Sequence, residues 1–147
     1  MIVKAAESDI AEICAIEQKS FPDPWAEALF QDILNNPSQC FYVAKNNRNH
    51  IVGYIIFWSI VDEVHILNLC VAPEYLKQGV GSHLLQFCLE FYKGKTISLF
   101  SLEVRTSNSA AQKLYEKFGF KGMYIRKNYY PNHEDALVMT FSPCMPK

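Results

Sequence analysis

Hydrophobic residues recur at every third or fourth position in some segments and form short runs in others, which predicts a mixture of helices and strands. A short strand is predicted at residues 3–6, followed by a helix over residues 9–21 that Ser8 caps. Pro24 is predicted to open a second helix that ends at Leu34, because proline is favoured in the first turn of a helix.

The middle of the chain has the pattern of an antiparallel sheet. Residues 40–45 and 50–58 are apolar runs joined by the polar segment NNRNH, so they predict a β-hairpin. Residues 64–71 follow as a third apolar run and predict a further antiparallel strand.

Residues 66–92 combine an apolar strand, a proline, a Gly-x-Gly turn and an amphipathic helix. Pro73 ends the strand because it lacks a backbone donor, and Gly79 and Gly81 let the main chain approach a ligand closely. The helix carries apolar residues at helical spacing, namely Val80, Leu84, Phe87, Cys88 and Phe91. Its first amides lack internal partners and lie at the positive end of the helix dipole, so they suit a phosphate or pyrophosphate group.

The Gly-x-Gly turn could match any of three kinds of phosphate-binding loop. The P-loop string is missing from the sequence, and Leu84 stands where the dinucleotide-binding motif needs a third glycine. The remaining form is a short cradle between a strand and a helix that holds a pyrophosphate. On the two glycines alone, a tight turn that binds nothing is an equally good interpretation.

The last third of the chain continues as a strand at 97–104, a helix at 108–118, a strand at 120–128 and a strand at 136–142, with a frayed tail at 143–147. An antiparallel front half followed by this alternation predicts an α+β sheet covered by helices. With 147 residues and no linker, the chain is expected to form a single domain over residues 1–147.

Composition excludes several classes of protein. Half of the residues are hydrophobic and the formal charge is −1, which argues against a surface that coats nucleic acid. The longest apolar run, residues 51–61, is too short to span a bilayer, and the N-terminus has no signal-peptide core. We therefore expect a cytoplasmic protein without direct membrane or nucleic-acid partners.

Cysteine and histidine spacing predicts neither a disulfide framework nor a metal site. The cysteines contain no C-x-x-C pair, and the histidines share no ligand spacing, so each histidine is expected to be an ordinary buried or surface residue. The positions are Cys14, Cys40, Cys70, Cys88 and Cys144, and His50, His65, His83 and His133.

The strings VAPEYLKQGVG, ISLFSLEV and NSAAQKLY together resemble the GNAT family of N-acetyltransferases, and the resemblance covers nearly the whole chain. Within that family, IRKNYYP at 125–131 is similar to the bacterial ribosomal-protein-alanine N-acetyltransferases. The resemblance implies a GNAT fold, with a mixed, mostly antiparallel central sheet of about seven strands flanked by about four helices. It also implies acetyl-CoA as cosubstrate and no metal.

The resemblance assigns cofactor-binding residues one by one. The turn would hold the pyrophosphate through Lys77, Gln78, Gly79, Val80, Gly81 and Ser82. The preceding strand would bind the pantetheine arm and the thioester carbonyl through the main chain of Leu69, Cys70 and Val71. Asn108 is expected to cap its helix, to contact coenzyme A, or both. The family pattern has Gln or Arg where Leu76 stands, so we expect weaker cofactor affinity rather than loss of binding.

Glu103 is the candidate general base. Strand alternation places it on the face of Leu99 and Ser101, and half-burial is expected to raise its pKa from about 4.3 toward neutrality. From spacing alone, an ion pair with Arg105 on the same strand face is the better interpretation. The resemblance reverses this preference, because the catalytic glutamate of those enzymes matches Glu103.

Tyr115 is the candidate general acid, because a phenol of pKa about 10 can protonate a departing thiolate. Periodicity alone makes it an ordinary core aromatic, and the resemblance supplies the catalytic role. Tyr129 and Tyr130 are candidates to grip the substrate, or else turn aromatics without a partner. Trp25 either walls the acceptor side or belongs to the core.

The leading functional hypothesis is transfer of acetyl from acetyl-CoA to the N-terminal alanine of the eighteenth small-subunit ribosomal protein. Direct attack in a ternary complex is favoured over an acyl-enzyme on Cys70, for which no activating partner can be inferred. The alternatives are the same chemistry on other protein N-termini, lysine or a small-molecule amine, and a non-catalytic acyl-CoA-binding module. The protein is expected to be a monomer or a weak homodimer.

Overall fold

The computed structural model describes residues 1–143, and its seven strands form a single sheet in the order β1-β2-β3-β4-β5-β7-β6. Neighbouring strands are antiparallel except β4 and β5, which run parallel. The strands are β1 (Ile2–Lys4), β2 (Gln39–Lys45), β3 (Ile51–Ile60), β4 (Glu63–Val71), β5 (Leu99–Arg105), β6 (Lys121–Arg126) and β7 (Ala136–Phe141). The predicted α+β class with a mostly antiparallel seven-stranded sheet is confirmed.

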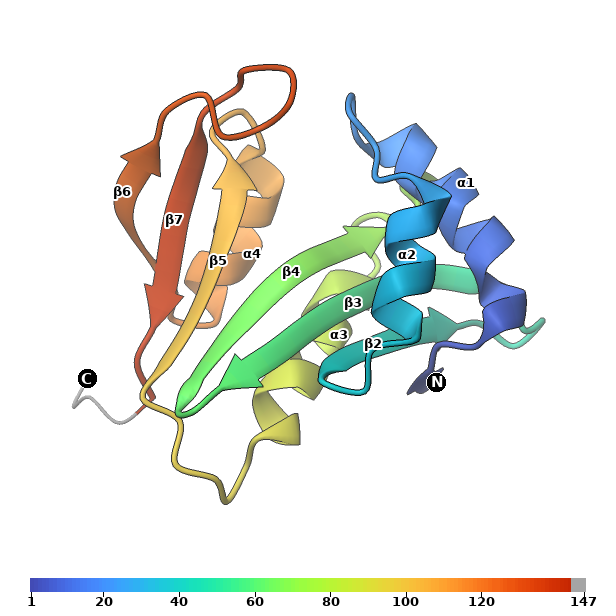
Figure 1. Ribbon diagram of the computed structural model, residues 1–147, viewed down its shortest axis with the longest axis horizontal. Helices are drawn as coiled ribbons and strands as arrows, with labels where there is room; N and C mark the ends of the chain where they lie inside the picture. The colour runs from blue at the N-terminus through green and yellow to red at the C-terminus, as the bar shows by residue number, and fades with distance from the viewer. Residues whose placement is uncertain (144–147) are drawn as a thin grey trace.

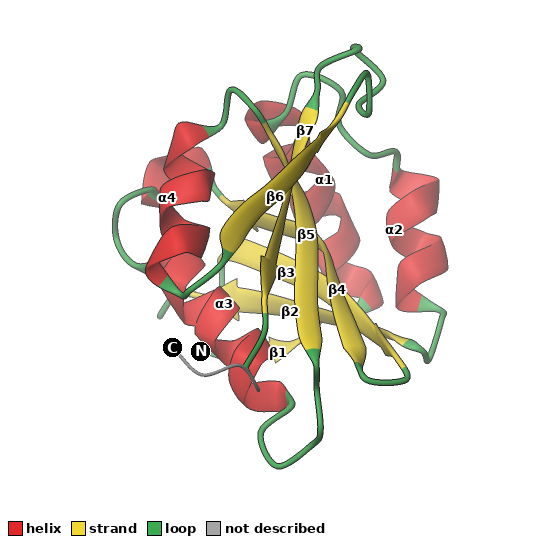
Figure 2. Ribbon diagram, turned by 90° about the vertical axis from the view of Figure 1, so that its left-hand side faces the viewer, coloured by secondary structure: helices red, strands yellow, loops and turns green. Residues whose placement is uncertain are grey.

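Four α-helices cover the sheet in two layers. α1 and α2 lie on one face, over β2 to β4, and α3 and α4 lie on the other (Figures 1 and 2). The helices are α1 (Ile10–Ser20), α2 (Glu27–Leu34), α3 (Val80–Phe91) and α4 (Ser109–Lys117), with short 3-10 turns η1 (Glu7–Asp9) and η2 (Pro73–Tyr75). None of the helices within residues 1–143 is long and apolar enough to cross a bilayer.

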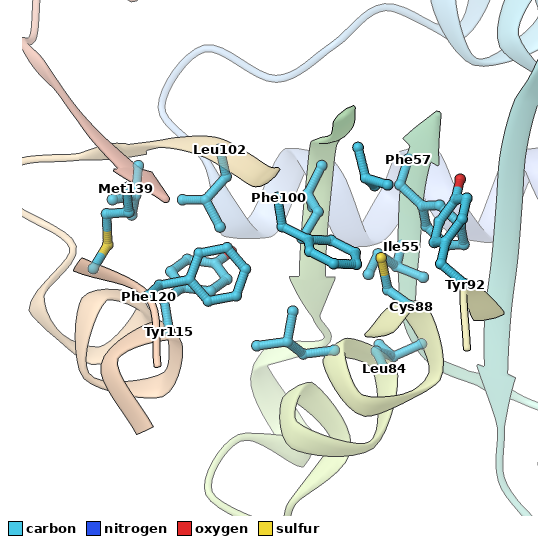
Figure 3. Packing of buried hydrophobic residues seen from close by; sticks show 14 of the residues in the cluster. Ile55, Phe57, Leu84, Cys88, Tyr92, Phe100, Leu102, Tyr115, Phe120 and Met139 are labelled. Carbon is cyan, nitrogen blue, oxygen red and sulfur yellow. The ribbon is translucent and has the colours of Figure 1, made fainter. Parts of the chain in front are cut away.

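The two layers enclose two hydrophobic clusters. Figure 3 shows the larger one, in which Leu84 and Cys88 of α3 and Tyr115 of α4 pack under the sheet. The smaller cluster joins α1 and α2 to the opposite face through residues such as Ile13 and Phe30. Because both faces of β3 are covered, its residues 51–57 are all buried, which explains their continuous apolar run.

The sheet divides between β4 and β5. The register of β4 against β3 shifts so that Ile56 faces Asn68 while Phe57 faces Ile66, which leaves Leu67 as a bulged residue. The parallel ladder with β5 ends at Ile66 and Leu102, and the two strands diverge beyond that point (Figure 1). The remainder of β4 therefore presents an edge that β5 does not occupy.

Some predicted boundaries were wrong. Ser8 lies inside η1 and caps nothing; the carboxylate of Asp9 instead accepts a bond from Ala6 N at 2.8 Å. α2 begins at Glu27 rather than Pro24, because the PDPW segment forms an irregular loop before it. The predicted tail falls, apart from Pro143, outside the described residues.

Candidate active site

A cleft of about 420 Å³ opens where β4 and β5 part. It brings together most of the catalytic and substrate-side candidates, which come from elements far apart in the sequence. The candidates among its lining residues are Trp25, Leu69, Glu103, Asn108, Tyr115, Tyr129 and Tyr130. The cleft is also lined by Glu17, Asn68 and Arg105, for which the sequence predicted no functional role.

Glu103 is paired with His65, not with Arg105. Nε2 of His65 lies 2.8 Å from Oε1 of Glu103, and the Tyr129 hydroxyl lies 3.5 Å from the same oxygen. Burial alone raises the pKa of Glu103, but the hydrogen bond and charge of His65 and the charge of Arg126 outweigh it. The pKa of Glu103 is therefore held below its ordinary value, and the predicted rise toward neutrality was wrong.

Arg105 is a buried hub that joins two loops. Its guanidinium donates to Asp23 in the α1–α2 loop, and to Asn132 Oδ1 and Glu134 Oε1 in the β6–β7 loop, each at 3.0 Å. Its Cζ also lies 4.0 Å from the ring centroid of Tyr130. The ion pair predicted from spacing between Arg105 and Glu103 is thus replaced by pairs with Asp23 and Glu134, because the loops reach the end of β5.

Tyr115 belongs to the hydrophobic core and also lines the cleft. Its ring packs at 5.8 Å from that of Phe120 inside the larger cluster (Figure 3), while the residue also lines the cleft. Burial raises the pKa of its hydroxyl well above the ordinary value. The phenol therefore stays protonated at neutral pH, as a proton donor requires, but it is a weaker acid than a free tyrosine.

The three aromatic candidates for substrate binding pack against other rings. The rings of Tyr129 and Tyr130 meet edge-on at 5.0 Å, and both residues line the cleft. Trp25 combines the two predicted possibilities, since it packs at 5.5 Å from Phe30 in the smaller cluster and also lines the cleft. One wall of the cleft is therefore built from rings of the α1–α2 and β6–β7 loops, which Arg105 joins.

Glu17 fixes the position of the Trp25 loop. Its Oε2 accepts a bond from Trp25 N at 3.0 Å, and its Oε1 accepts from the Tyr54 hydroxyl at 2.6 Å and from Asn68 Nδ2 at 3.1 Å. Three donors satisfy this buried carboxylate, and they join α1 to β3, to β4 and to the loop. Sequence pattern placed Glu17 on helix α1 but gave no sign of these partners.

The N-terminus of α3 has the features of an anion cradle. Gly79 occupies the N-cap position with φ of 85°, no side chain caps the helix, and no acidic residue stands in its first turn. A Cβ on Gly81 would lie 3.0 Å from Leu114 Cδ2 and 3.5 Å from Val71 Cγ2. The first turn of α3 therefore packs between the free end of β4 and α4, directly beside the cleft.

Residues 77–82 and the end of β4 are not among the residues that line the cleft. Leu69 lines the cleft, whereas Cys70, Val71 and the 77–82 turn lie beyond its rim. The edge of β4 connects the two places, because its ladder with β5 has already ended at Ile66. β4 therefore runs from the cleft at Leu69 to Val71, beside the first turn of α3.

Asn108 caps α4, as predicted. Its Oδ1 accepts a bond from Ala111 N at 3.2 Å, which leaves the Nδ2 group available to the cleft.

Cys70 is only 4% exposed, and burial raises the pKa of its thiol to about 11. A thiol in that state is a poor nucleophile, which weighs against an acyl-enzyme.

The cysteines of the described residues are free thiols. Cys14, Cys40, Cys70 and Cys88 are unpaired, and Cys144 lies outside the described residues. Within residues 1–143, no group of three or more His, Cys, Asp or Glu side chains is arranged to hold a metal ion.

Comparison with known proteins decides the family. A family model described as "Acetyltransferase (GNAT) family" matches residues 10–120. The chain belongs to the GNAT family of acetyltransferases. It is an acetyl-CoA-dependent N-acetyltransferase, and its sheet and helices have the GNAT fold.

Similar proteins share a more specific name. The chain is 41% identical to a Bacillus subtilis (strain 168) protein provisionally named [ribosomal protein bS18]-alanine N-acetyltransferase, over 89% of this chain and 87% of that protein. It is 33% identical to the [ribosomal protein bS18]-alanine N-acetyltransferase of Escherichia coli (strain K12), over 90% of each. The crystal structure of the ribosomal-protein-S18-alanine N-acetyltransferase from Escherichia coli superposes with a TM-score of 0.88 at 31% identity, covering 100% of this chain and 96% of that one.

The contacts of Arg105 lead to a stability prediction. Arg105→Lys keeps the charge but cannot reach Asp23, Asn132 and Glu134 together, so we expect the free energy of unfolding to fall by about 1–3 kcal/mol. Urea unfolding followed by circular dichroism measures the change. Arg48→Lys, at an exposed position in the β2–β3 turn, is the matched control and should change stability by less than about 0.5 kcal/mol. Equal losses for the two variants would mean that the hub stabilises nothing.

Proposed function

We propose that this GNAT enzyme transfers acetyl from acetyl-CoA to the N-terminal alanine of ribosomal protein bS18, in the cytoplasm. The observation that carries the proposal is the common cleft of Glu103, Tyr115, Tyr129 and Tyr130, at the end of a β4 edge that leads to the α3 amides. The names of the bacterial relatives supply the identity of the acceptor.

The residues present fit acetyl-CoA. The uncapped first turn of α3 offers free amides without a competing carboxylate, so Gln78, Gly79, Val80, Gly81 and Ser82 would hold the pyrophosphate, assisted by Lys77. The free edge of β4 at Leu69, Cys70 and Val71 would bind the pantetheine arm through the main chain. Bound there, acetyl-CoA supplies an activated acyl group and a thiolate leaving group.

The chain's own residues would manage two protons. Glu103 would accept the proton of the substrate ammonium, whose pKa of about 8 makes it easier to remove than that of a lysine. Tyr115 would present its hydroxyl proton to the departing sulfur, and burial keeps that proton in place until then. Trp25, Tyr129 and Tyr130 would align the acceptor peptide.

Direct attack in a ternary complex accounts for the site better than an acyl-enzyme. Cys70, the candidate nucleophile, is buried, lies beyond the rim of the cleft and has a raised pKa. Glu103 and Tyr115 instead line one cavity, so the amine and the thioester can be oriented together.

A peptide panel tests the acceptor. We expect free thiol to appear when the protein is given acetyl-CoA and a peptide with the alanine N-terminus of bS18. The pre-acetylated peptide should release none, because it has no free α-amine. A peptide with a blocked N-terminus and a free lysine serves as the second control. Thiol release with that lysine peptide, but not with free N-termini, would contradict the proposed acceptor.

The proton-transfer roles lead to a second prediction. Glu103→Gln and Tyr115→Phe should each lower kcat by about 100-fold or more, because they remove the acceptor and the donor of the two protons. The affinity for acetyl-CoA, measured by calorimetry, should change by less than about 2-fold, since binding uses the β4 edge and the α3 amides. Full turnover by both variants would disprove the assigned roles.

The cradle leads to a third prediction with a close control. Gly79 and Gly94 have φ of 85° and 84°, and a Cβ at either position would meet no atom of residues 1–143 within 4 Å. Alanine should therefore cost about 1 kcal/mol of stability at both sites, through left-handed strain alone. Calorimetry should show a dissociation constant for acetyl-CoA about fivefold higher in Gly79→Ala and unchanged in Gly94→Ala. Equal affinities would place the pyrophosphate elsewhere.

A further inference from the structure

His65 lies beside the candidate base because the sheet holds it there. It stands opposite Ser101 in the parallel ladder, and Glu103 follows two residues later on the same face of β5. The ladder ends one residue beyond His65, and of the two residues Glu103 lines the cleft while His65 lies behind it. The 2.8 Å contact between Nε2 and Oε1 is therefore set by two rigid strands rather than by mobile loops.

The charges around the pair come from neighbouring elements. Arg126 of β6 acts on Glu103 through its charge, and the hydroxyl of Tyr129 lies 3.5 Å from Oε1. Tyr130 in the β6–β7 loop interacts with Glu103 as well. On the other side, His65 faces uncharged Trp58 of β3, and exposed Glu63 precedes it by two residues on β4. Among these groups, imidazole is the type that changes charge between pH 5 and 8.

We propose that His65 and Glu103 act as one proton-accepting pair, in which His65 positions the carboxylate and sets the pH below which the pair stops accepting the substrate's proton. This inference rests on the proposed role of Glu103 as general base. His65 is a positioning residue, because it acts through Glu103.

The neutral and the charged imidazole have different effects on the base. A neutral ring donates its Nε2 proton to Oε1 and leaves Oε2 of Glu103 free of that bond. In a turnover the substrate ammonium loses one proton, the carboxylate takes it up, and water receives it afterwards. A ring that already carries a second proton forms an ion pair with Glu103 and lowers its affinity for the incoming proton.

The side-chain exposures agree with this role. The His65 side chain is 32% exposed and that of Glu103 is 12% exposed, so the ring exchanges protons with solvent more readily than the carboxylate does. Through His65, the half-buried carboxylate of Glu103 therefore responds to the pH of the bulk solvent.

His65→Gln separates positioning from titration, because glutamine keeps an N–H donor but does not change charge. We expect the ratio of kcat/KM in His65→Gln to that in the wild type to rise about tenfold between pH 7.5 and pH 5.5, because an imidazole can gain a charge in this range and glutamine cannot. Taking the ratio cancels the titration of the substrate amine. His50→Gln, at an exposed position in the β2–β3 turn, is the control and should give a flat ratio.

His65→Leu removes the donor as well as the charge. We expect kcat at pH 8 to fall about tenfold in His65→Leu and to stay near the wild-type value in His65→Gln. In the ligand-free protein, the carboxyl carbon of Glu103 followed by NMR should show a higher pKa in His65→Leu than in the wild type, because the hydrogen bond and charge of His65 no longer offset burial. If His65→Leu does not fold, the profile of His65→Gln decides.

Two outcomes are distinguishable. A flat ratio for His65→Gln, or an unchanged pKa of Glu103 in His65→Leu, overturns the pair while Glu103→Gln remains inactive. Full activity of Glu103→Gln instead overturns the general base itself, and with it the proposed mechanism.

Discussion

The parallel pairing between β4 and β5 stops at Ile66 and Leu102, and the position of each candidate group follows from that end point. The bulge at Leu67 shifts the register of β4 where the ladder ends, while the larger hydrophobic cluster still joins β3 and β4 to β5 and β7. The gap exposes main-chain groups of β4 on one side and the side chains of Glu103 and Arg105 on the other. The free edge of β4 and the wall that carries Glu103 and Arg105 therefore both result from the end of the β4–β5 ladder.

Polar groups at this gap are satisfied in a way that also orders the loops. Glu17 receives three donors and Arg105 contacts three acceptors, so the α1–α2 and β6–β7 loops are fixed at the mouth of the cleft. Buried charged networks of this kind contribute more to a unique arrangement than to raw stability. Preorganised walls matter in a transferase, because two substrates must be aligned before reaction.

Periodicity and turn residues predicted the strand order in sequence, the four helices and the cradle glycines, because those depend on local patterns. The partner of Glu103 was beyond their reach. Arg105 lies two residues away on the same face, whereas His65 comes from a strand 38 residues earlier and meets Glu103 only through the parallel register. The predicted direction of the Glu103 pKa shift was wrong for the same reason. The sequence pattern indicated that Glu103 is partly buried, but it did not reveal the neighbouring imidazole of His65. The same holds for Asp23 and Glu134, which reach Arg105 from two loops.

Tyr115 belongs both to the hydrophobic cluster and to the cleft, so its ring and its hydroxyl serve separate needs. Phenylalanine would fill the same space against Phe120 and delete a single oxygen atom. Under the proposed role, the single substitution Tyr115→Phe would turn a working transferase into a well-folded protein that still binds acetyl-CoA but no longer consumes it.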